Sequence, residues 1–230
     1  MKTIGVLGGM SWESSLEWYR LANERVRDRL GGHHSARILL DSLDFAEIEA
    51  MQAQDDWDAA GNLLAGRALA LERAGAELLV LCTNTMHLVA EQIQDAVSIP
   101  FLHIVDVTAE AIRPSRVRTV GLLGTAFTME RPFYAERLAA HGIHTIVPDA
   151  EERRVVHEVI YDELVHGVVS EESRQRYQRI MDGLVDRGAE GIILGCTEIE
   201  LLIGEGDAAV PIYPTTSLHV DAALAAAMGD

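Results

Sequence analysis

The sequence predicts an α/β protein with two pseudo-symmetric lobes, each a mostly parallel sheet of about four strands flanked by helices. Three observations predict this fold class. Hydrophobic runs of four to six residues alternate with helix-length amphipathic segments, which is typical of sheets covered by helices. The chain of 230 residues is long enough to form two small lobes. Finally, three short segments of the first half have similar segments in the second half, in the same order.

The apolar runs give the expected strands, and the amphipathic segments give the expected helices. Strands are predicted at residues 3–8, 36–42, 78–81, 101–103, 119–123, 144–147, 191–194 and 210–213. Helices are predicted at residues 11–29, 55–73, 129–141, 151–165, 170–187 and 218–228. Trp12 and Trp57 lie in these helical segments or at their ends, and we expect both to be packing residues.

The two halves of the chain match at three pairs of segments. In chain order, residues 4–8 match 120–124, residues 73–77 match 187–190, and residues 99–101 match 210–212. Gly8 and Cys82 are 74 residues apart, and Gly124 and Cys196 are 72 residues apart. Three matches in one order at nearly one spacing indicate two similar lobes. We assign residues 1–105 plus 216–230 to the first lobe and residues 106–215 to the second.

Composition excludes several classes of function. The net charge of −17 argues against nucleic acid as a partner, because binding phosphates requires a basic face. Lys2 is the only lysine, and a pyridoxal-phosphate enzyme needs a lysine for its Schiff base. The apolar runs are too short to span a bilayer, and no signal peptide is recognisable at the N-terminus. We therefore expect a cytoplasmic protein that binds neither membranes nor a cofactor.

Cys82 and Cys196 are the only cysteines, and each follows a predicted buried strand. The carboxyl ends of strands in open α/β sheets are where ligands bind. A helix that starts there offers free N–H groups to a carboxylate and is expected to lower the pKa of a nearby thiol. Because the two cysteines occupy equivalent positions in the repeat, we expect them to face each other across the cleft between the lobes.

Three other interpretations of the cysteines compete with a catalytic one. A cysteine after a hydrophobic strand is usually a small core residue. A disulfide is unusual in the cytoplasm. A zinc site made of Cys82, His87 and Cys196 would need a further ligand and lacks a C-x-x-C spacing. The Cys-Thr pair at both equivalent positions favours the catalytic interpretation, because a coincidence would have to occur twice.

At these residues the sequence resembles the aspartate/glutamate racemase family. Residues 79–87 (LVLCTNTMH) are similar to its first signature and residues 192–199 (IILGCTEI) to its second, while residues 4–12 (IGVLGGMSW) are similar to its N-terminus. The resemblance implies a cofactor-independent racemase that acts on a small-molecule amino-acid substrate, with Cys82 and Cys196 as the catalytic acid/base thiols. It also implies that the last helix packs back on the first lobe and that the protein is a homodimer.

Racemisation removes the Cα proton from one face and returns a proton to the other, so a base and an acid are needed on opposite sides. The carboxylate must be neutralised, because the Cα proton is weakly acidic. Met10 and Ser11 follow a glycine turn and are expected to line the floor of the cleft. The resemblance implies that the other substrate-binding residues are Gln52, in a loop after residues 44–47, and Thr83, Asn84, Thr85, Thr125, Thr197 and Glu198. No metal site is predicted.

Two departures from the family pattern concern substrate range. Aspartate-specific members resemble one another in a lysine near residues 160–167, and this sequence has none there. Glu200 stands where the second signature usually has a small or turn-forming residue. Other enzymes of the superfamily, such as maleate isomerases and hydantoin racemases, remain alternatives. So does a non-catalytic amino-acid-binding module.

Overall fold

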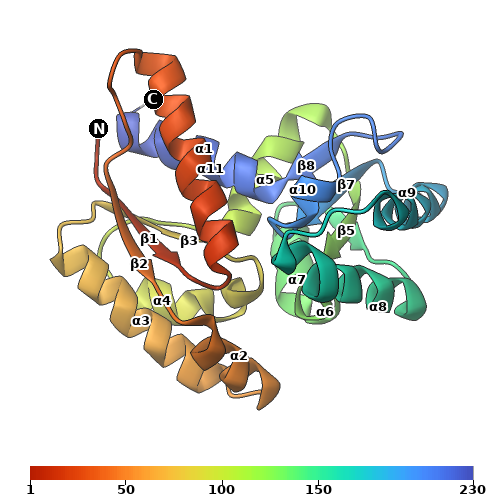
Figure 1. Cartoon of the computed structure of the whole chain (residues 1–230), viewed down its shortest axis with the longest axis horizontal. Coiled ribbons are helices and arrows are strands. Elements are labelled where there is room, and N and C mark those ends of the chain that lie inside the picture. Colours follow the sequence, from red (N-terminus) through yellow and green to blue (C-terminus); the bar gives the residue numbers. More distant parts are fainter. Residues whose placement is uncertain (230) are drawn as a thin grey trace. The chain divides into compact units, whose positions relative to one another are not determined.

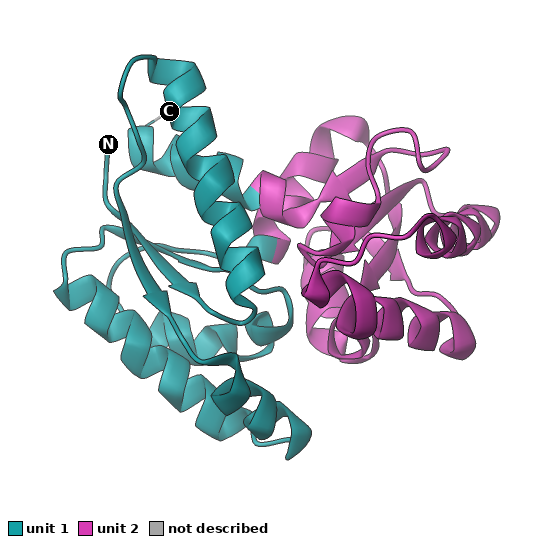
Figure 2. Cartoon of the chain, viewed as in Figure 1, with its two compact units in different colours: residues 1–104, 219–230 teal, residues 105–218 magenta. Residues whose placement is uncertain are grey.

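The computed structural model describes residues 1–229, and the chain divides into two compact units (Figure 2). Unit 1 consists of Met1–Ile104 and the C-terminal segment that starts at His219, and unit 2 consists of Val105–Leu218. The C-terminal helix α11 (Thr215–Met228) therefore begins in unit 2 and continues in unit 1. Within residues 1–229, no helix combines the length and the apolar character needed to cross a membrane.

The sheet of unit 1 has four parallel strands in the order β2-β1-β3-β4. They are β1 (Ile4–Gly8), β2 (Ile38–Ser42), β3 (Leu78–Leu81) and β4 (Phe101–Leu102). Every residue of β1 and β3 is buried. Central strands of a parallel sheet are covered on both faces, which explains why these two strands are continuous apolar runs.

Helices cover both faces of this sheet. Trp18 and Ala22 pack with Val80 on one face, and Ala60 and Leu64 pack with Leu79 on the other. The first face is covered by α1 (Trp12–Leu30) and α11, and the second by α3 (Trp57–Arg73) and α4 (Ala90–Asp95) (Figure 1).

Unit 2 repeats this topology, with four parallel strands in the order β6-β5-β7-β8. The strands are β5 (Thr119–Gly124), β6 (His144–Ile146), β7 (Gly191–Gly195) and β8 (Ile212–Pro214). The helices are α5 (Ile104–Ile112), α6 (Ala126–Glu130), α7 (Pro132–Ala140), α8 (Ala150–Glu158), α9 (Glu171–Asp186) and α10 (Ile199–Leu202). The predicted α/β class with about four mostly parallel strands in each lobe is confirmed.

Two of the predicted helices are interrupted in the structure. The helix expected at residues 129–141 is two helices, because Pro132 starts α7 and the preceding Arg131 is extended, as residues before proline prefer to be. The helix expected at residues 151–165 ends as α-helix at Glu158. A π-helical turn, Val159–Glu163, and then a short 3₁₀ turn follow it.

Helix α2 (Phe45–Ala53) was not predicted, although the sequence carries a signal for it. The carboxylate of Asp44 accepts a hydrogen bond from the N–H of Ala46 at 3.1 Å and caps the helix N-terminus. Phe45, Ile48 and Gln52 are spaced as one helical face, and the last two are buried. Trp12, expected to be a packing residue, is 61% exposed, so that expectation is wrong, whereas Trp57 packs against the core.

Candidate active site

In unit 1 the candidate residues gather at the carboxyl ends of β1 and β3. The N–H of Cys82 donates to the carbonyl of Leu7 at 2.8 Å, which places Cys82 beside the end of β1. Gly9 then turns the chain with φ +90°, and a Cβ at this position would lie 2.2 Å from the carbonyl oxygen of Leu43. Only glycine fits this turn, which brings the two residues after Gly9 to the same edge of the sheet as Cys82.

Met10 and Ser11 are the residues that follow this turn. Met10 is buried in the core of unit 1. The hydroxyl of Ser11 accepts the N–H of Ser14 at 3.3 Å and caps α1. Both residues thus already have structural roles at the edge where the sequence analysis expected them to line the floor of a cleft.

Cys82 is buried among apolar side chains that include Val80 and Val220. Burial raises the pKa of its thiol far above the usual range, because an apolar environment disfavours the thiolate. A 3₁₀ turn, Thr85–Val89, follows the cysteine where the sequence analysis expected a helix start. Thr83 is half-buried, and Asn84 and Thr85 are buried.

His87 holds the loop that carries these residues. Its Nδ1 lies 2.7 Å from the carbonyl oxygen of Thr83, and its Nε2 accepts the N–H of Ile104 at 3.1 Å. Nδ1 is therefore the protonated nitrogen, and both ring nitrogens are engaged. The ring also stands beside the buried rings of His103 and His219. These contacts favour a structural role for His87 over one in tuning Cys82.

Gln52 is not in the loop that the sequence analysis assigned to it, and this placement is wrong. It lies on α2 and is buried, and its amide Nε2 is 3.0 Å from the sulfur of Met86. Because Met86 follows Thr85, this contact joins α2 to the loop after Cys82. Unit 1 therefore brings together seven of the predicted residues: Met10, Ser11, Gln52, Cys82, Thr83, Asn84 and Thr85.

In unit 2 the equivalent edge of the sheet carries Thr125 and Cys196. Gly124 of β5 pairs in register with Gly195 of β7, so the residues that follow them leave the sheet side by side. The hydroxyl of Thr125 accepts the N–H of Thr128 at 3.3 Å and caps α6, so Thr125 is an N-cap as well as a candidate substrate contact.

Cys196 has a carboxylate partner. Its thiol donates a hydrogen bond to Oε2 of Glu198 at 2.9 Å, and both side chains are buried. Burial raises the pKa of Cys196 well above the usual range, and the negative charge of Glu198 raises it further. A carboxylate beside a thiol makes the thiolate unfavourable, so Cys196 is held as the protonated thiol.

The segment after Cys196 is tied to the start of α11. The hydroxyls of Thr197 and Thr216 are 2.9 Å apart, and the carboxylate of Glu200 accepts the N–H of Thr216 at 2.8 Å. Glu200, one of the two departures named in the sequence analysis, therefore stabilises the start of this helix. Thr197 and Glu198 lie with Thr125 and Cys196 in unit 2.

The prediction that at least one thiol has a depressed pKa is wrong, because the pKa of both thiols is raised. The expected helix N-termini are too short to oppose burial, since a 3₁₀ turn follows Cys82 and α10 has only four residues. The zinc alternative finds no support either. Among residues 1–229, no group of three or more His, Cys, Asp or Glu side chains could hold a metal ion.

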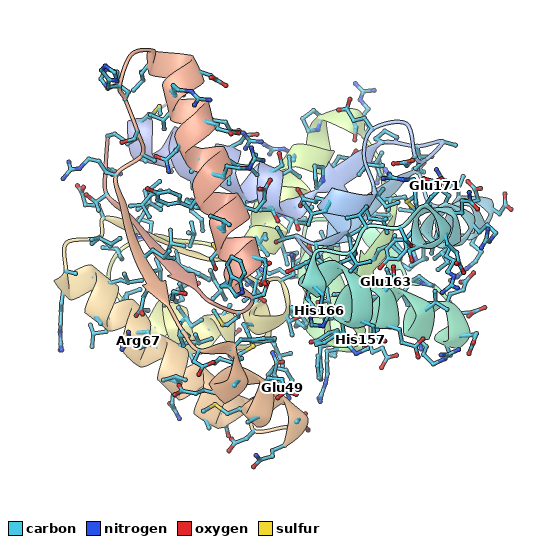
Figure 3. All side chains as sticks on the ribbon, viewed as in Figure 1. Glu49, Arg67, His157, Glu163, His166 and Glu171 are labelled. Atoms are coloured by element: carbon cyan, nitrogen blue, oxygen red, sulfur yellow. The ribbon has the colours of Figure 1, made fainter. Side chains whose placement is uncertain are left out.

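His157 of α8 was not predicted (Figure 3). Its Nδ1 accepts the N–H of Ala126 at 3.2 Å, so its ring lies beside the residue that follows Thr125. No sequence signal distinguishes this histidine from other polar residues of an amphipathic helix.

Comparison with known proteins gives one consistent result. The sequence profile of the family described as Asp/Glu/Hydantoin racemase matches residues 7–223. The broad specificity amino-acid racemase RacX of Bacillus subtilis (strain 168) is 27% identical over 165 residues, which cover 70% of this chain and 70% of the relative.

Solved structures agree over the whole chain. A candidate Asp/Glu racemase from Yersinia pestis is 49% identical with a TM-score of 0.93, over 99% of this chain and 100% of that one. An aspartate racemase homologue from Pyrococcus horikoshii OT3 is 35% identical with a TM-score of 0.88, again over 99% and 100% of the two chains.

Proposed function

This chain belongs to the Asp/Glu/Hydantoin racemase family, and we propose that it racemises an amino acid of the aspartate/glutamate class without a cofactor. In this proposal Cys82 and Cys196 move the Cα proton. One observation carries it: the two thiols end equivalent strands, β3 and β7, in two units with the same strand order. Family membership supports amino-acid racemase activity, and the thiols supply the chemistry it needs.

The reaction transfers one proton at each thiol. A thiolate takes the Cα proton from one face of the substrate and becomes a thiol, leaving the electron pair on the substrate. The second thiol then gives its proton to the opposite face and becomes the thiolate. The substrate is inverted, and the enzyme ends with its two protonation states exchanged. The reverse reaction starts from that exchanged form, so both thiols are needed in each direction.

The surroundings of the two thiols differ and support different roles for them. Cys196 donates to the carboxylate of Glu198, so a negative charge at Cys196 would lie beside another negative charge. The side chains packed with Cys82 are apolar, and burial alone raises its pKa. We propose that both thiols rest protonated, that Cys82 gives up its proton first when the substrate binds, and that Cys196 is the acid. The positive charge of the substrate ammonium group favours the thiolate once the substrate is bound.

The developing charge on the substrate carboxylate requires donors that are already in place. Asn84, Thr85, Thr125 and Thr197 supply amide and hydroxyl groups, and each of them lies within three residues of a catalytic thiol or on the strand end beside one. No step of this mechanism uses a Schiff base. The only lysine of the chain is Lys2.

The direct test is incubation with single enantiomers followed by chiral chromatography. We expect L-Glu, L-Asp or L-homoserine to give both enantiomers after the protein has been dialysed against a chelator, with no pyridoxal phosphate or flavin added. Isomerisation of maleate or racemisation of a hydantoin, without amino-acid turnover, would assign a different reaction of the superfamily. Binding of an amino acid without turnover would identify a binding module and overturn the proposal.

A homodimer is part of the proposal. Trp12, Leu16 and Tyr19 of α1 are exposed apolar side chains with helical spacing, and a second copy of the chain would cover such a stripe. Light scattering coupled to size exclusion is expected to give twice the 25.2 kDa mass of the chain. The monomer mass, in a sample that is active, would remove the dimer from the proposal.

A further inference from the structure

His157 lies at the edge of the sheet where the catalytic segment of unit 2 begins. Its Nδ1 accepts the backbone N–H of Ala126 at 3.2 Å, and Ala126 directly follows Thr125. Thr125 and Cys196 leave the sheet side by side, because Gly124 and Gly195 are paired in register. The imidazole therefore lies beside the residue that follows Thr125, and Thr125 is a proposed donor to the substrate carboxylate.

The hydrogen bond to Ala126 determines which ring nitrogen carries the proton. Nδ1 acts as the acceptor, so the proton is on Nε2. Within residues 1–229, Nε2 makes no hydrogen bond, and the side chain is only half-buried. Burial also lowers the pKa of His157, in agreement with a ring kept neutral by this bond. His157 thus presents one neutral N–H donor that is not used by the protein.

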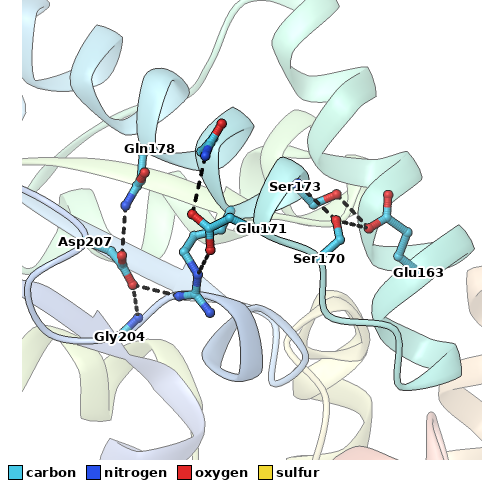
Figure 4. A network of polar contacts seen from close by, with 9 residues as sticks. Glu163, Ser170, Glu171, Ser173, Gln178, Gly204 and Asp207 are labelled. Atoms are coloured by element: carbon cyan, nitrogen blue, oxygen red, sulfur yellow. Dashed lines mark hydrogen bonds and ion pairs between the residues drawn. The ribbon is translucent and has the colours of Figure 1, made fainter.

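The segment around His157 is held in place on both sides. Its ring packs on Tyr161 of the π-helical turn, with the two centroids 4.5 Å apart. At the end of that turn, the carboxylate of Glu163 accepts the hydroxyls of Ser170 and Ser173 at 3.2 and 2.6 Å (Figure 4). These bonds fix the turn to the start of α9. π-helical turns inside helices occur often at functional sites.

The charged groups around the His157 ring give it slightly acidic surroundings. Glu130, Glu158 and Asp162 are the carboxylates with an electrostatic effect on the ring. Arg153 pairs with Glu130 at 2.9 Å, and Arg154 pairs with Glu158 at 2.6 Å. Asp162 therefore leaves the surroundings slightly acidic, and the ring itself supplies a hydrogen bond without a positive charge.

We propose that the Nε2–H of His157 donates a hydrogen bond to the end of the substrate side chain, which makes His157 a specificity residue for side chains that end in an acceptor. Hydroxyl, amide and carboxylate ends all accept such a bond, so the site takes neutral polar amino acids as well as acidic ones. This inference rests on the proposed racemase function and names the substrate class of that site.

Two substitutions of His157 separate the loss of the Nε2–H donor from the loss of the hydrogen bond that Nδ1 accepts from Ala126. In His157→Asn, the amide oxygen stands near the position of Nδ1 and can still accept the N–H of Ala126, but no donor reaches the position of Nε2. In His157→Gln, an amide donor reaches that position while the bond to Ala126 is lost. His144→Asn is the matched control, because His144 is an exposed histidine of β6 in the same unit.

The measured quantity is the ratio of kcat/KM for an acceptor-bearing amino acid (glutamate, glutamine or homoserine) to that for alanine or 2-aminobutyrate. We expect His157→Asn to lower this ratio about 10-fold, which is about 1.4 kcal/mol, with the thermal midpoint unchanged. His157→Gln is expected to recover most of the ratio with a lower thermal midpoint. For alkyl substrates that do not turn over, their inhibition constants take the place of kcat/KM.

An equal loss for all substrates in His157→Asn, or no loss, would overturn the role of His157 while leaving the racemase function intact. Absence of turnover in the wild-type protein would overturn the racemase function itself. The two failures are therefore distinguishable. A change of the same size in His144→Asn would also contradict the inference.

Discussion

Cys82 and Cys196 end equivalent strands of two units with the same topology, yet their surroundings differ. The buried thiol of Cys82 packs among apolar side chains, whereas that of Cys196 donates to the carboxylate of Glu198. The repeated fold explains why both thiols are at strand ends. The side chains around each cysteine differ, and in the proposed mechanism this difference makes Cys82 the thiol that gives up its proton first.

The largest expected effect is the loss of either thiol. Serine has a far less acidic hydroxyl, so Cys82→Ser and Cys196→Ser should each lower the rate of racemisation by about 10³-fold or more. Chiral chromatography of L- and D-glutamate measures this in both directions. Because the equilibrium constant of racemisation is one, kcat/KM must fall equally in the two directions. A single variant that keeps near-wild-type activity would make its cysteine a packing residue.

A second effect concerns the histidines that pack beside the Cys82 loop. Burial lowers the pKa of His219 to about 4 in the folded protein, against about 6.5 when unfolded. Its contribution to stability is therefore present above pH 6.5 and is lost as the pH falls from 6.5 towards 4. Between pH 7 and pH 5 this amounts to about 2 kcal/mol of unfolding free energy.

Urea unfolding of wild-type protein and of His219→Asn at the two pH values measures this loss. The variant lacks the titrating ring, so its stability should fall by about 2 kcal/mol less between pH 7 and pH 5. His144→Asn, which changes an exposed histidine, should behave like the wild type. Equal acid sensitivity in all three proteins would show that His219 is not kept neutral by burial.

The smallest expected effect tests whether Glu198 acts on the thiol of Cys196 alone. Removing the charge in Glu198→Gln should lower the pKa of Cys196 and speed its alkylation by iodoacetamide about 10-fold at pH 7.5. Cys82, in the other unit, should label at its original slow rate. Peptide mass spectrometry resolves the two sites, and Glu205→Gln is an exposed control. Equal acceleration at both thiols would contradict a local role for Glu198.

Much of the architecture could be predicted because it depends on patterns that repeat along the chain. The continuous apolar strands and the paired Gly and Cys landmarks predict two parallel sheets, and both are confirmed. Pro132 splits a predicted helix, as its missing N–H and the extended Arg131 require. Helix α2 is not among the predicted helices, although Asp44 and Glu47 have the spacing of a capping box, because its apolar face is too short to show a helical period.

The properties of the site were harder to predict, because they depend on contacts between segments distant in sequence. Nothing around residue 52 in the sequence shows that Gln52 lies against Met86. Similarly, nothing near residue 157 shows that His157 lies beside Ala126. The sequence predicts a depressed pKa for at least one thiol because a helix is expected after each strand, but burial is the larger effect and raises the pKa of both thiols.

The most direct test of the two-base mechanism is exchange of the Cα proton in D₂O. In the wild-type protein, racemisation should bring solvent deuterium into both enantiomers. In each Cys→Ser variant the remaining thiolate can still remove a proton and return a deuteron to the same face. We therefore predict that Cys82→Ser labels one enantiomer without inverting it and that Cys196→Ser labels the other. Labelling of the same enantiomer by both variants, or undiminished racemisation by either, would contradict the two-base mechanism.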